Sequence, residues 1–115
     1  MPVSKRPSRQ TAAVRGSRSG RPIMALLDLL GRRWTLRILW ELREGRKLTS
    51  RELRTACDEA SPTVLQARLT DLREAGFVAL ADGGGYSLTP LGQELSENVL
   101  PLHRFAERWK GQLQR

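Results

Sequence analysis

The sequence predicts a mainly α-helical domain that carries one small β-hairpin. Apolar residues recur at spacings of three and four over most of the chain, which indicates amphipathic helices. The pairs Ser61-Pro62 and Thr89-Pro90 each mark a helix start, because the hydroxyl caps the first turn and proline suits its first position. The glycine run at residues 82–85 separates two short strand-like segments and therefore predicts a hairpin turn.

Length and composition are those of one small globular domain. The chain has 115 residues, of which 39% are hydrophobic and 28% are charged. It contains no apolar run near the roughly 20 residues that cross a bilayer, and its N-terminus lacks the apolar stretch of a secretory signal. A single cysteine, Cys57, excludes a disulfide within the chain. We therefore expect a cytoplasmic protein without a membrane partner.

The net charge of +8 is concentrated at the N-terminus. Residues 1–22 carry +6 and no acid, whereas the rest of the chain holds 14 basic and 12 acidic side chains. We expect a disordered basic arm over residues 1–22 and a folded domain over residues 23–115. Such an arm suits DNA, with Arg15, Arg18 and Arg21 as its predicted contacts; a merely solubilising tail is the alternative.

The first half of the domain predicts three helices. The first begins near Ile23 and ends at Gly31, and the second covers about residues 34–44. A brief extended piece at residues 47–49 precedes a short helix over residues 51–57, with Ser50 as its N-cap. The apolar positions of these helices are Ile23, Leu26, Leu27 and Leu30, then Leu36, Leu39, Trp40 and Leu42, then Leu53 and Ala56.

The second half predicts a longer helix, a hairpin and a final helix. The longer helix runs from Pro62 to about Ala75, the strands cover residues 77–81 and 86–88, and the final helix begins at Pro90. Pro101 is expected to interrupt that helix and to bend it. A short helix, a tight turn, a longer capped helix and a hairpin make up the winged helix-turn-helix arrangement. In that arrangement, the longer helix, here about residues 62–75, enters the major groove of DNA.

The helix over residues 62–75 has an apolar side and an uncharged polar side. Leu65, Leu69 and Leu72 fall in one narrow sector, with Val64 beside it, and are expected to face the core. The opposite side is short and uncharged near its N-terminal end, and amide, hydroxyl and methyl groups of this kind match base edges. The predicted base contacts are Thr63, Gln66, Ala67 and Thr70.

A second set of residues is predicted to contact the DNA backbone: Arg51, Arg54, Ser61, Arg68, Arg73 and Gly84. Arg51 and Arg54 lie on the helix that should cross the backbone; a solvated helix face is the alternative for both. Arg68 lies beside the apolar sector. It either reaches a phosphate or pairs with Glu52 or another acid of the preceding helix, and the pairing is slightly favoured.

From Leu26 onward, the chain resembles the HxlR-type family of bacterial winged helix-turn-helix regulators. The resemblance is carried by residues 30–39 (LGRRWTLRIL), by residues 61–69 (SPTVLQARL) with residues 72–78 (LREAGFV), and by residues 86–92 (YSLTPLG). Trp109 lies where that family often ends its last helix. The resemblance implies transcription control by homodimers whose first and last helices form the subunit contact.

Two features depart from that family. Many relatives respond to electrophiles or oxidants through a cysteine just before the first helix, and residues 1–30 contain none. Cys57 is instead expected to be a small buried apolar residue. The hairpin turn is also short and contains an acid, so we expect it to contact DNA only through backbone amides. An unidentified small-molecule effector is a further candidate partner.

The final helix predicts a homodimer. Its apolar residues recur at spacings of three and four, and a lone helix projecting from so small a domain cannot bury them all within its own subunit. Twofold symmetry would match a palindromic operator. The predicted interface residues are Leu26, Leu102, Phe105, Trp109 and Leu113. The alternative is that the helix folds back on the first two helices of its own chain.

We expect no enzymatic activity, no cofactor and no metal. His103 is the only histidine, has no neighbouring nucleophile in the sequence, and is expected to be solvated or to lie in an interface. One cysteine and one histidine, far apart in the sequence, cannot satisfy zinc. A winged-helix module for protein–protein contact, without specific DNA readout, is the strongest rival interpretation.

Overall fold

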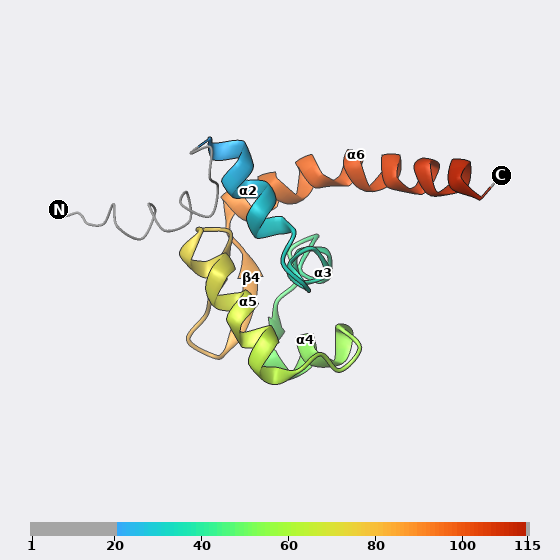
Figure 1. The fold of residues 1–115 in the computed structure, drawn as a ribbon. Helices are drawn as coiled ribbons and strands as arrows, with labels where there is room; N and C mark the ends of the chain where they lie inside the picture. Colours follow the sequence, from blue (N-terminus) through green and yellow to red (C-terminus); the bar gives the residue numbers. More distant parts are fainter. Residues whose placement is uncertain (1–20, 115) are drawn as a thin grey trace.

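A computed structural model describes residues 21–114 and shows a mainly helical fold with one small sheet. Residues 1–20, which include Arg15 and Arg18 of the predicted arm, lie outside the described residues. Figure 1 shows α6 running past the other elements and projecting beyond them at its C-terminal end. The elements are α2 (Pro22–Leu30), α3 (Thr35–Glu41), β2 (Leu48–Thr49), α4 (Ser50–Ala56), α5 (Pro62–Glu74), β3 (Val78–Leu80), β4 (Gly85–Leu88) and α6 (Pro90–Leu113).

The core lies where α3, α4 and α5 meet. Leu53 of α4 and Leu69 and Leu72 of α5 are completely buried, and Leu65 is nearly so. This confirms the apolar side predicted for the longer helix. Cys57 belongs to the same cluster and has no exposed surface, as expected of a small apolar residue. The leucines therefore pack one side of α5 against the core, and the opposite side of the helix is exposed.

The sheet has three antiparallel strands in the order β2-β4-β3, one more than the predicted hairpin. Leu48 lies opposite Tyr86, and Thr49 opposite Gly85, so the extended piece at residues 47–49 forms the third strand. The predicted cap at Ser50 is wrong by one residue. Thr49 caps α4 instead, because its hydroxyl accepts from the amide of Glu52 at 3.1 Å while the Glu52 carboxylate accepts from the amide of Thr49 at 2.8 Å.

Two helix predictions need correction. Helix α3 begins at Thr35 rather than residue 34, because Trp34 has a left-handed backbone with φ 77°, and it ends at Glu41. Its buried side carries Ile38, whereas Leu36 and Trp40 are 46% and 37% exposed. Helix α6 continues through Pro101 without a break. Helix α2 begins at Pro22, next to the predicted start near Ile23.

Gly92 allows α6 to pack directly on the backbone before β3. A Cβ atom at this position would overlap the carbonyl oxygen of Phe77, which cannot move aside as a side chain could. We expect Gly92→Ala to lower the free energy of unfolding by about 2 kcal/mol or more. Gly111 is the control, because a Cβ there meets open space and alanine favours a helix. Urea unfolding that gives both variants equal stability would contradict this packing.

Candidate nucleic-acid interface

The outer side of α5 presents the residues predicted to contact bases. Ser61 begins the helix, since its hydroxyl accepts from the amide of Val64 at 3.5 Å, and Pro62 takes the first helical position. Thr63, Gln66 and Thr70 are exposed, and Ala67 is half-buried. The structure thus brings the four residues to one accessible face, as the helical spacing predicts.

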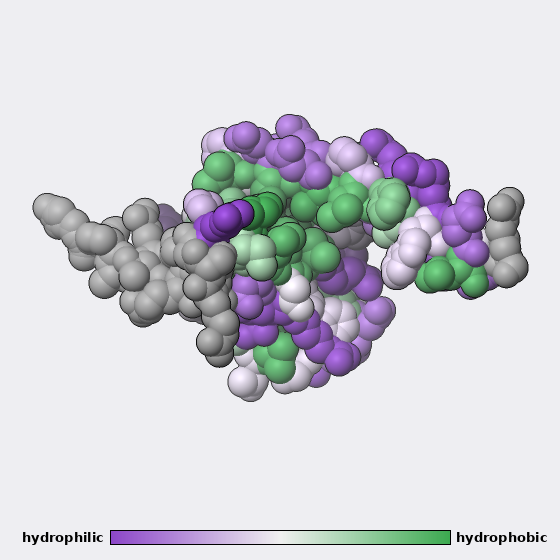
Figure 2. All heavy atoms as spheres, turned by 45° about the horizontal axis from the view of Figure 1, so that its top comes forward, coloured by the Kyte–Doolittle hydropathy of each residue, from purple (hydrophilic) through white to green (hydrophobic). Residues whose placement is uncertain are grey.

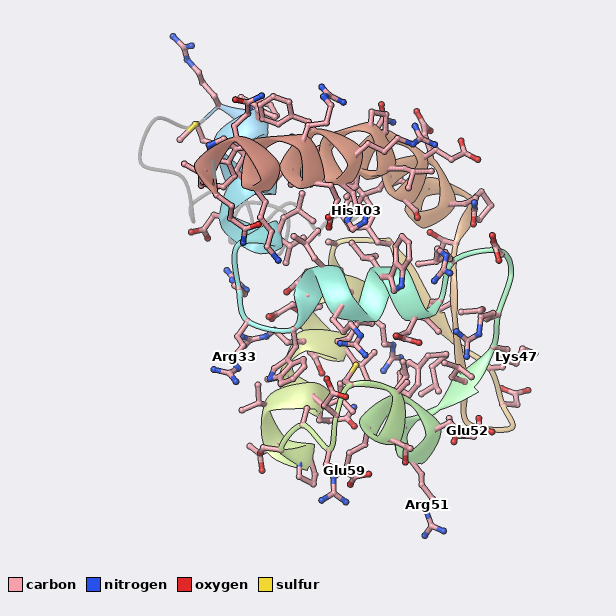
Figure 3. All side chains as sticks on the ribbon, turned by 90° about the vertical axis from the view of Figure 1, so that its right-hand side faces the viewer. Arg33, Lys47, Arg51, Glu52, Glu59 and His103 are labelled. Carbon is pink, nitrogen blue, oxygen red and sulfur yellow. The ribbon has the colours of Figure 1, made fainter. Side chains whose placement is uncertain are left out.

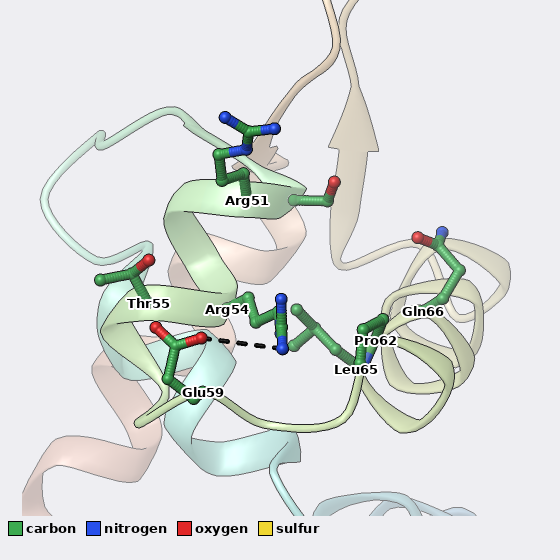
Figure 4. A pocket seen from close by; sticks show the side chains of 8 residues that line it. Arg51, Arg54, Thr55, Glu59, Pro62, Leu65 and Gln66 are labelled. Atoms are coloured by element: carbon green, nitrogen blue, oxygen red, sulfur yellow. Dashed lines mark ion pairs between the residues drawn. The ribbon is translucent and has the colours of Figure 1, made fainter.

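A groove separates α4 from the N-terminal half of α5 (Figure 4). The two arginines that line the groove, Arg51 and Arg54, differ in whether their side chains already have partners within the protein. Arg54 donates from Nε to the carbonyl of Ala60 at 3.2 Å and lies 3.8 Å from the carboxylate of Glu59. Within residues 21–114, the side chain of Arg51 makes no hydrogen bond or ion pair, and Figure 3 shows it extending away from the domain. Arg51 is therefore the more available of the two cations.

The side chain of Arg68 is largely buried and paired within the domain, so its charge is not available to DNA. Its Nε lies 3.0 Å from Asp71 of its own helix, and only 23% of the side chain is exposed. The predicted partner on the preceding helix is wrong, because the carboxylate of Glu52 caps α4. Asp71 also binds Arg32 at 3.0 Å. Burial opposes the charge of Arg32, but hydrogen bonding and attraction to Asp71 and then Asp28 outweigh it and raise its pKa.

The wing turn offers fewer free donors than expected. Gly84 has φ +92°, a left-handed backbone that glycine adopts without strain. Its amide already donates to the carbonyl of Ala81 at 2.9 Å, so it is not an open donor for a phosphate. Arg73, near the end of α5, is exposed.

The turn between α4 and α5 is held in an uncommon backbone conformation. Asp58 and Glu59 both have a positive φ, 57° and 60°, which side chains other than glycine adopt at a cost. Arg37 of α3 secures the turn, because it donates to the carbonyl of Ala56 at 2.6 Å and to the carboxylate of Asp58 at 3.4 Å. This role of Arg37 could not be predicted from the sequence, because Ala56 and Asp58 lie about 20 positions further along the chain.

Tyr86 is a second residue that the sequence analysis missed. It lies on β4, is 5% exposed, and accepts a hydrogen bond at 3.2 Å from Nε2 of Gln66. The three-stranded sheet β2-β4-β3, which we term the wing sheet, is thereby joined to the outer side of α5. Nothing in the local pattern around either residue indicates this contact, since 20 positions separate them.

An apolar surface covers α2 and the second half of α6 (Figure 2). Residues 101–114 are exposed throughout, so most of the apolar side chains in this half of α6 are left uncovered by their own chain. Leu26, which was predicted to lie in the dimer interface, is half-buried against the core. The exposed side of α2 presents Ile23, Met24 and Leu27 instead. We define the apolar surface as Ile23, Met24 and Leu27 of α2 and Leu102, Phe105, Trp109 and Leu113 of α6, which are 45–64% exposed.

His103 joins α6 to α3. Its ring stacks on Trp40, with 5.2 Å between the centroids, and Figure 3 shows it pointing from α6 toward α3. The guanidinium of Arg43 lies 3.7 Å from the centroid of Trp40 as well. His103 therefore has a packing partner within its own subunit, although it is exposed.

Two other kinds of site have no counterpart in the described part of the chain. Residues 21–114 contain no group of three or more histidine, cysteine, aspartate or glutamate side chains placed to hold a metal ion. Among the described helices, none combines the length and apolar character needed to span a membrane.

Comparison with known proteins identifies a family. The HxlR-like helix-turn-helix family matches residues 29–114. An uncharacterized HTH-type transcriptional regulator from Synechocystis is 29% identical over 94 residues, covering 76% of this chain and 69% of the relative. Another, from Methanocaldococcus jannaschii, is 30% identical over 92 residues, covering 76% of this chain and 84% of the relative.

Two solved structures share the fold. The crystal structure of a possible HxlR family transcriptional factor from Thermoplasma volcanium is 26% identical and superposes with a TM-score of 0.67, covering 78% of this chain and 85% of that one. The crystal structure of quinone-bound YodB from B. subtilis is also 26% identical, with a TM-score of 0.69, covering 76% of this chain and 98% of that one.

Proposed function

The chain belongs to the HxlR-like helix-turn-helix family of transcriptional regulators, and from this premise we propose that it recognises a palindromic operator as a homodimer. Helix α5 lies in the major groove of each half-site. The protein acts in the cytoplasm by occupying DNA, and it catalyses no reaction.

The observation that carries the proposal is the two-sided character of α5. Three buried leucines fix its inner side, while Thr63, Gln66 and Thr70 stand exposed along its outer side. Amide and hydroxyl groups bond to base edges in the major groove, and a methyl group of threonine or alanine suits the thymine methyl. Ala67, which is half-buried, adds such a methyl group.

Backbone contacts position α5 on the duplex. Arg51 is the first of these because it is exposed and extends from α4 beside α5. Ser61 and Arg73 are exposed at the two ends of α5 and can reach flanking phosphates. Arg54 and Arg68 contribute less, because each already serves the protein's own carbonyl or carboxylate groups.

The dimer forms through the apolar surface of α2 and α6. An exposed surface with two aromatic rings and several aliphatic side chains is typical of a partner contact rather than of a monomer's exterior. A second copy of this chain is the economical partner, because twofold symmetry pairs the two α5 helices with the halves of a palindrome.

The basic arm adds affinity without reading sequence. Because Arg21 precedes α2 as its N-cap residue, a deletion should end at residue 20, which removes five of the arm's six positive charges. If these meet phosphates, the slope of log K against log salt becomes shallower by about 4 to 5. Fluorescence anisotropy at several salt concentrations measures the slope. An unchanged slope means that the arm is only a tail.

A selection from random duplexes tests the proposed function. We expect the bound pool to converge on an inverted repeat, with half-sites about 10–10.5 base pairs apart or a multiple of that spacing. The rival is a module for protein–protein contact, which the nearly neutral folded body permits. A pool that shows no sequence preference, together with purely salt-dependent binding, would favour the rival.

Any small-molecule effector acts without a bond to a thiol. One structural relative is described as quinone-bound, but the single cysteine of this chain, Cys57, is completely buried. Burial also raises the pKa of its thiol, and this effect outweighs the positive charge of Arg37, which lowers that pKa. The thiolate, which is the nucleophile, is therefore scarce at neutral pH.

We accordingly expect slow alkylation of the folded protein. At pH 7–8, iodoacetamide should modify Cys57 of the folded protein at least about 100-fold more slowly than Cys57 of the protein unfolded in urea. In the folded protein the reaction must wait for a local opening that exposes the buried thiol. Mass spectrometry follows the modification. Equal rates in the folded and unfolded protein would show that the thiol is accessible and would reopen the thiol route.

A further inference from the structure

We propose that Tyr86 is a positioning residue for base recognition, because its hydroxyl holds the carboxamide of Gln66 in place before DNA binds. The inference rests on the proposed function, and it extends the specificity site from α5 to the wing sheet. Its basis is one hydrogen bond, at 3.2 Å, between Nε2 of Gln66 and the Tyr86 hydroxyl.

Tyr86 is a rigid support for this bond. It is 5% exposed and belongs to the hydrophobic core. It also lies on β4, the central strand, with Leu48 of β2 opposite on one side and Leu80 of β3 on the other. A hydroxyl fixed in this way cannot follow a moving glutamine, so it restricts the glutamine instead.

Gln66 needs such a restraint in order to discriminate. Its side chain is exposed and has several rotatable bonds, and its terminal amide presents a donor and an acceptor whose places exchange when the group turns over. Among the described residues, Tyr86 is the one side chain that hydrogen-bonds to it. Loss of this bond would let the carboxamide move away from the position in which it can meet one base edge.

The observed arrangement, in which Nε2 donates to Tyr86, suits adenine. One amide hydrogen of Gln66 is occupied by Tyr86, which leaves the second hydrogen and the carbonyl oxygen Oε1. Adenine offers the complementary pair in the major groove, an acceptor at N7 and an amino donor at N6. We therefore assign Gln66, held by Tyr86, to an adenine in each half-site.

The variant Tyr86→Phe tests the role, because it removes the hydroxyl and keeps the ring in the core. We expect the wild-type protein to prefer adenine at one operator position by about tenfold, and Y86F to prefer it by about threefold or less. Affinity for unrelated duplexes should stay within about twofold. In a Gln66→Ala background, adding Y86F should change the preference no further, because the group to be positioned is absent.

A purely structural role for Tyr86 predicts a different result. Loss of a buried hydroxyl partner would lower thermal stability and affinity for all sequences alike, and the base preference would persist. Retention of the tenfold preference by Y86F therefore overturns the inference. If the preference survives in Gln66→Ala, the inference also fails, although the proposed function stands.

The free protein supplies a test that needs neither DNA nor a variant. NMR relaxation of the side-chain amides should show Gln66 clearly more restrained than Gln112, an exposed glutamine of α6. Equal mobility of the two amides overturns the inference even if the protein proves to be a specific DNA binder. A restrained Gln66 in a protein that selects no sequence would instead overturn the proposed function, and the role in specificity with it.

Discussion

Replacing Trp109 with glutamate is expected to convert the proposed dimer into a monomer and to lower operator affinity by about 10²–10⁴-fold. Trp109 is 56% exposed in the single chain and lies in the apolar surface that we assign to the partner. A carboxylate there would be buried without a counterion in the dimer. A monomer then holds one half-site without the gain that comes from linking two.

Gly111→Glu is the matched control for this variant. It adds the same charge to the same helix, but 200° further around it, at a position where a side chain meets open space. Sedimentation should show a monomer for Trp109→Glu and a dimer for Gly111→Glu. If Trp109→Glu remains a dimer at micromolar concentration, the subunit contact lies elsewhere.

Thr70→Glu is expected to lower operator affinity by at least about 100-fold without unfolding the protein. Thr70 is exposed at the middle of the outer side of α5, and Leu65, Leu69 and Leu72 remain in place behind it. A carboxylate at this point would meet base edges and phosphates, where a like charge costs several kcal/mol. In the proposed dimer the change would be present twice, once in each half-site.

Anisotropy titrations of the selected operator measure this loss, and thermal unfolding checks the fold. Gly111→Glu is again the control, since it carries the same charge far from α5 along the chain. An operator affinity for Thr70→Glu equal to that of the control would remove Thr70, and with it the middle of α5, from the interface.

Helix α5 could be predicted almost to the residue because its signals are local. Ser61-Pro62 starts it, the three leucines define its inner side, and Gly76 with φ +88° follows its end. The same local chemistry marks the start of α6, where Thr89 caps the amide of Gly92 at 3.0 Å. Caps and periodicity need no knowledge of the remainder of the fold.

Contacts between distant segments could not be predicted in this way. Strand β2 has two residues and therefore no measurable alternation, and its partner β4 lies more than 30 positions away. The short helix α3 is apolar around most of its surface, so the sequence does not say which side faces the core; Ile38 proved buried and Trp40 exposed. The ion pair between Arg68 and Asp71 took the place of an expected contact with α4.

For the candidate interface too, local features could be predicted and contacts between distant segments could not. Helical spacing places Thr63, Gln66 and Thr70 on one side of α5, which the structure leaves exposed. The hydrogen bonds from Gln66 to Tyr86 and from Arg37 to the turn between α4 and α5 depend on tertiary packing, and only the three-dimensional structure shows them. Which bases these side chains contact is a prediction for experiment.

A DNA-cutting tag on α5 tests the central claim most directly. In a Glu74→Cys variant, an iron chelate on the new thiol would lie one turn beyond Thr70, and Cys57 is too deeply buried to compete for the reagent. We expect strand cleavage in two patches, one in each half-site and about 10–10.5 base pairs or a multiple apart, and no such pattern from a tag on Gly111→Cys. Cleavage by the Gly111 tag within the half-sites, with none from the tag on α5, would contradict the placement of α5 in the major groove.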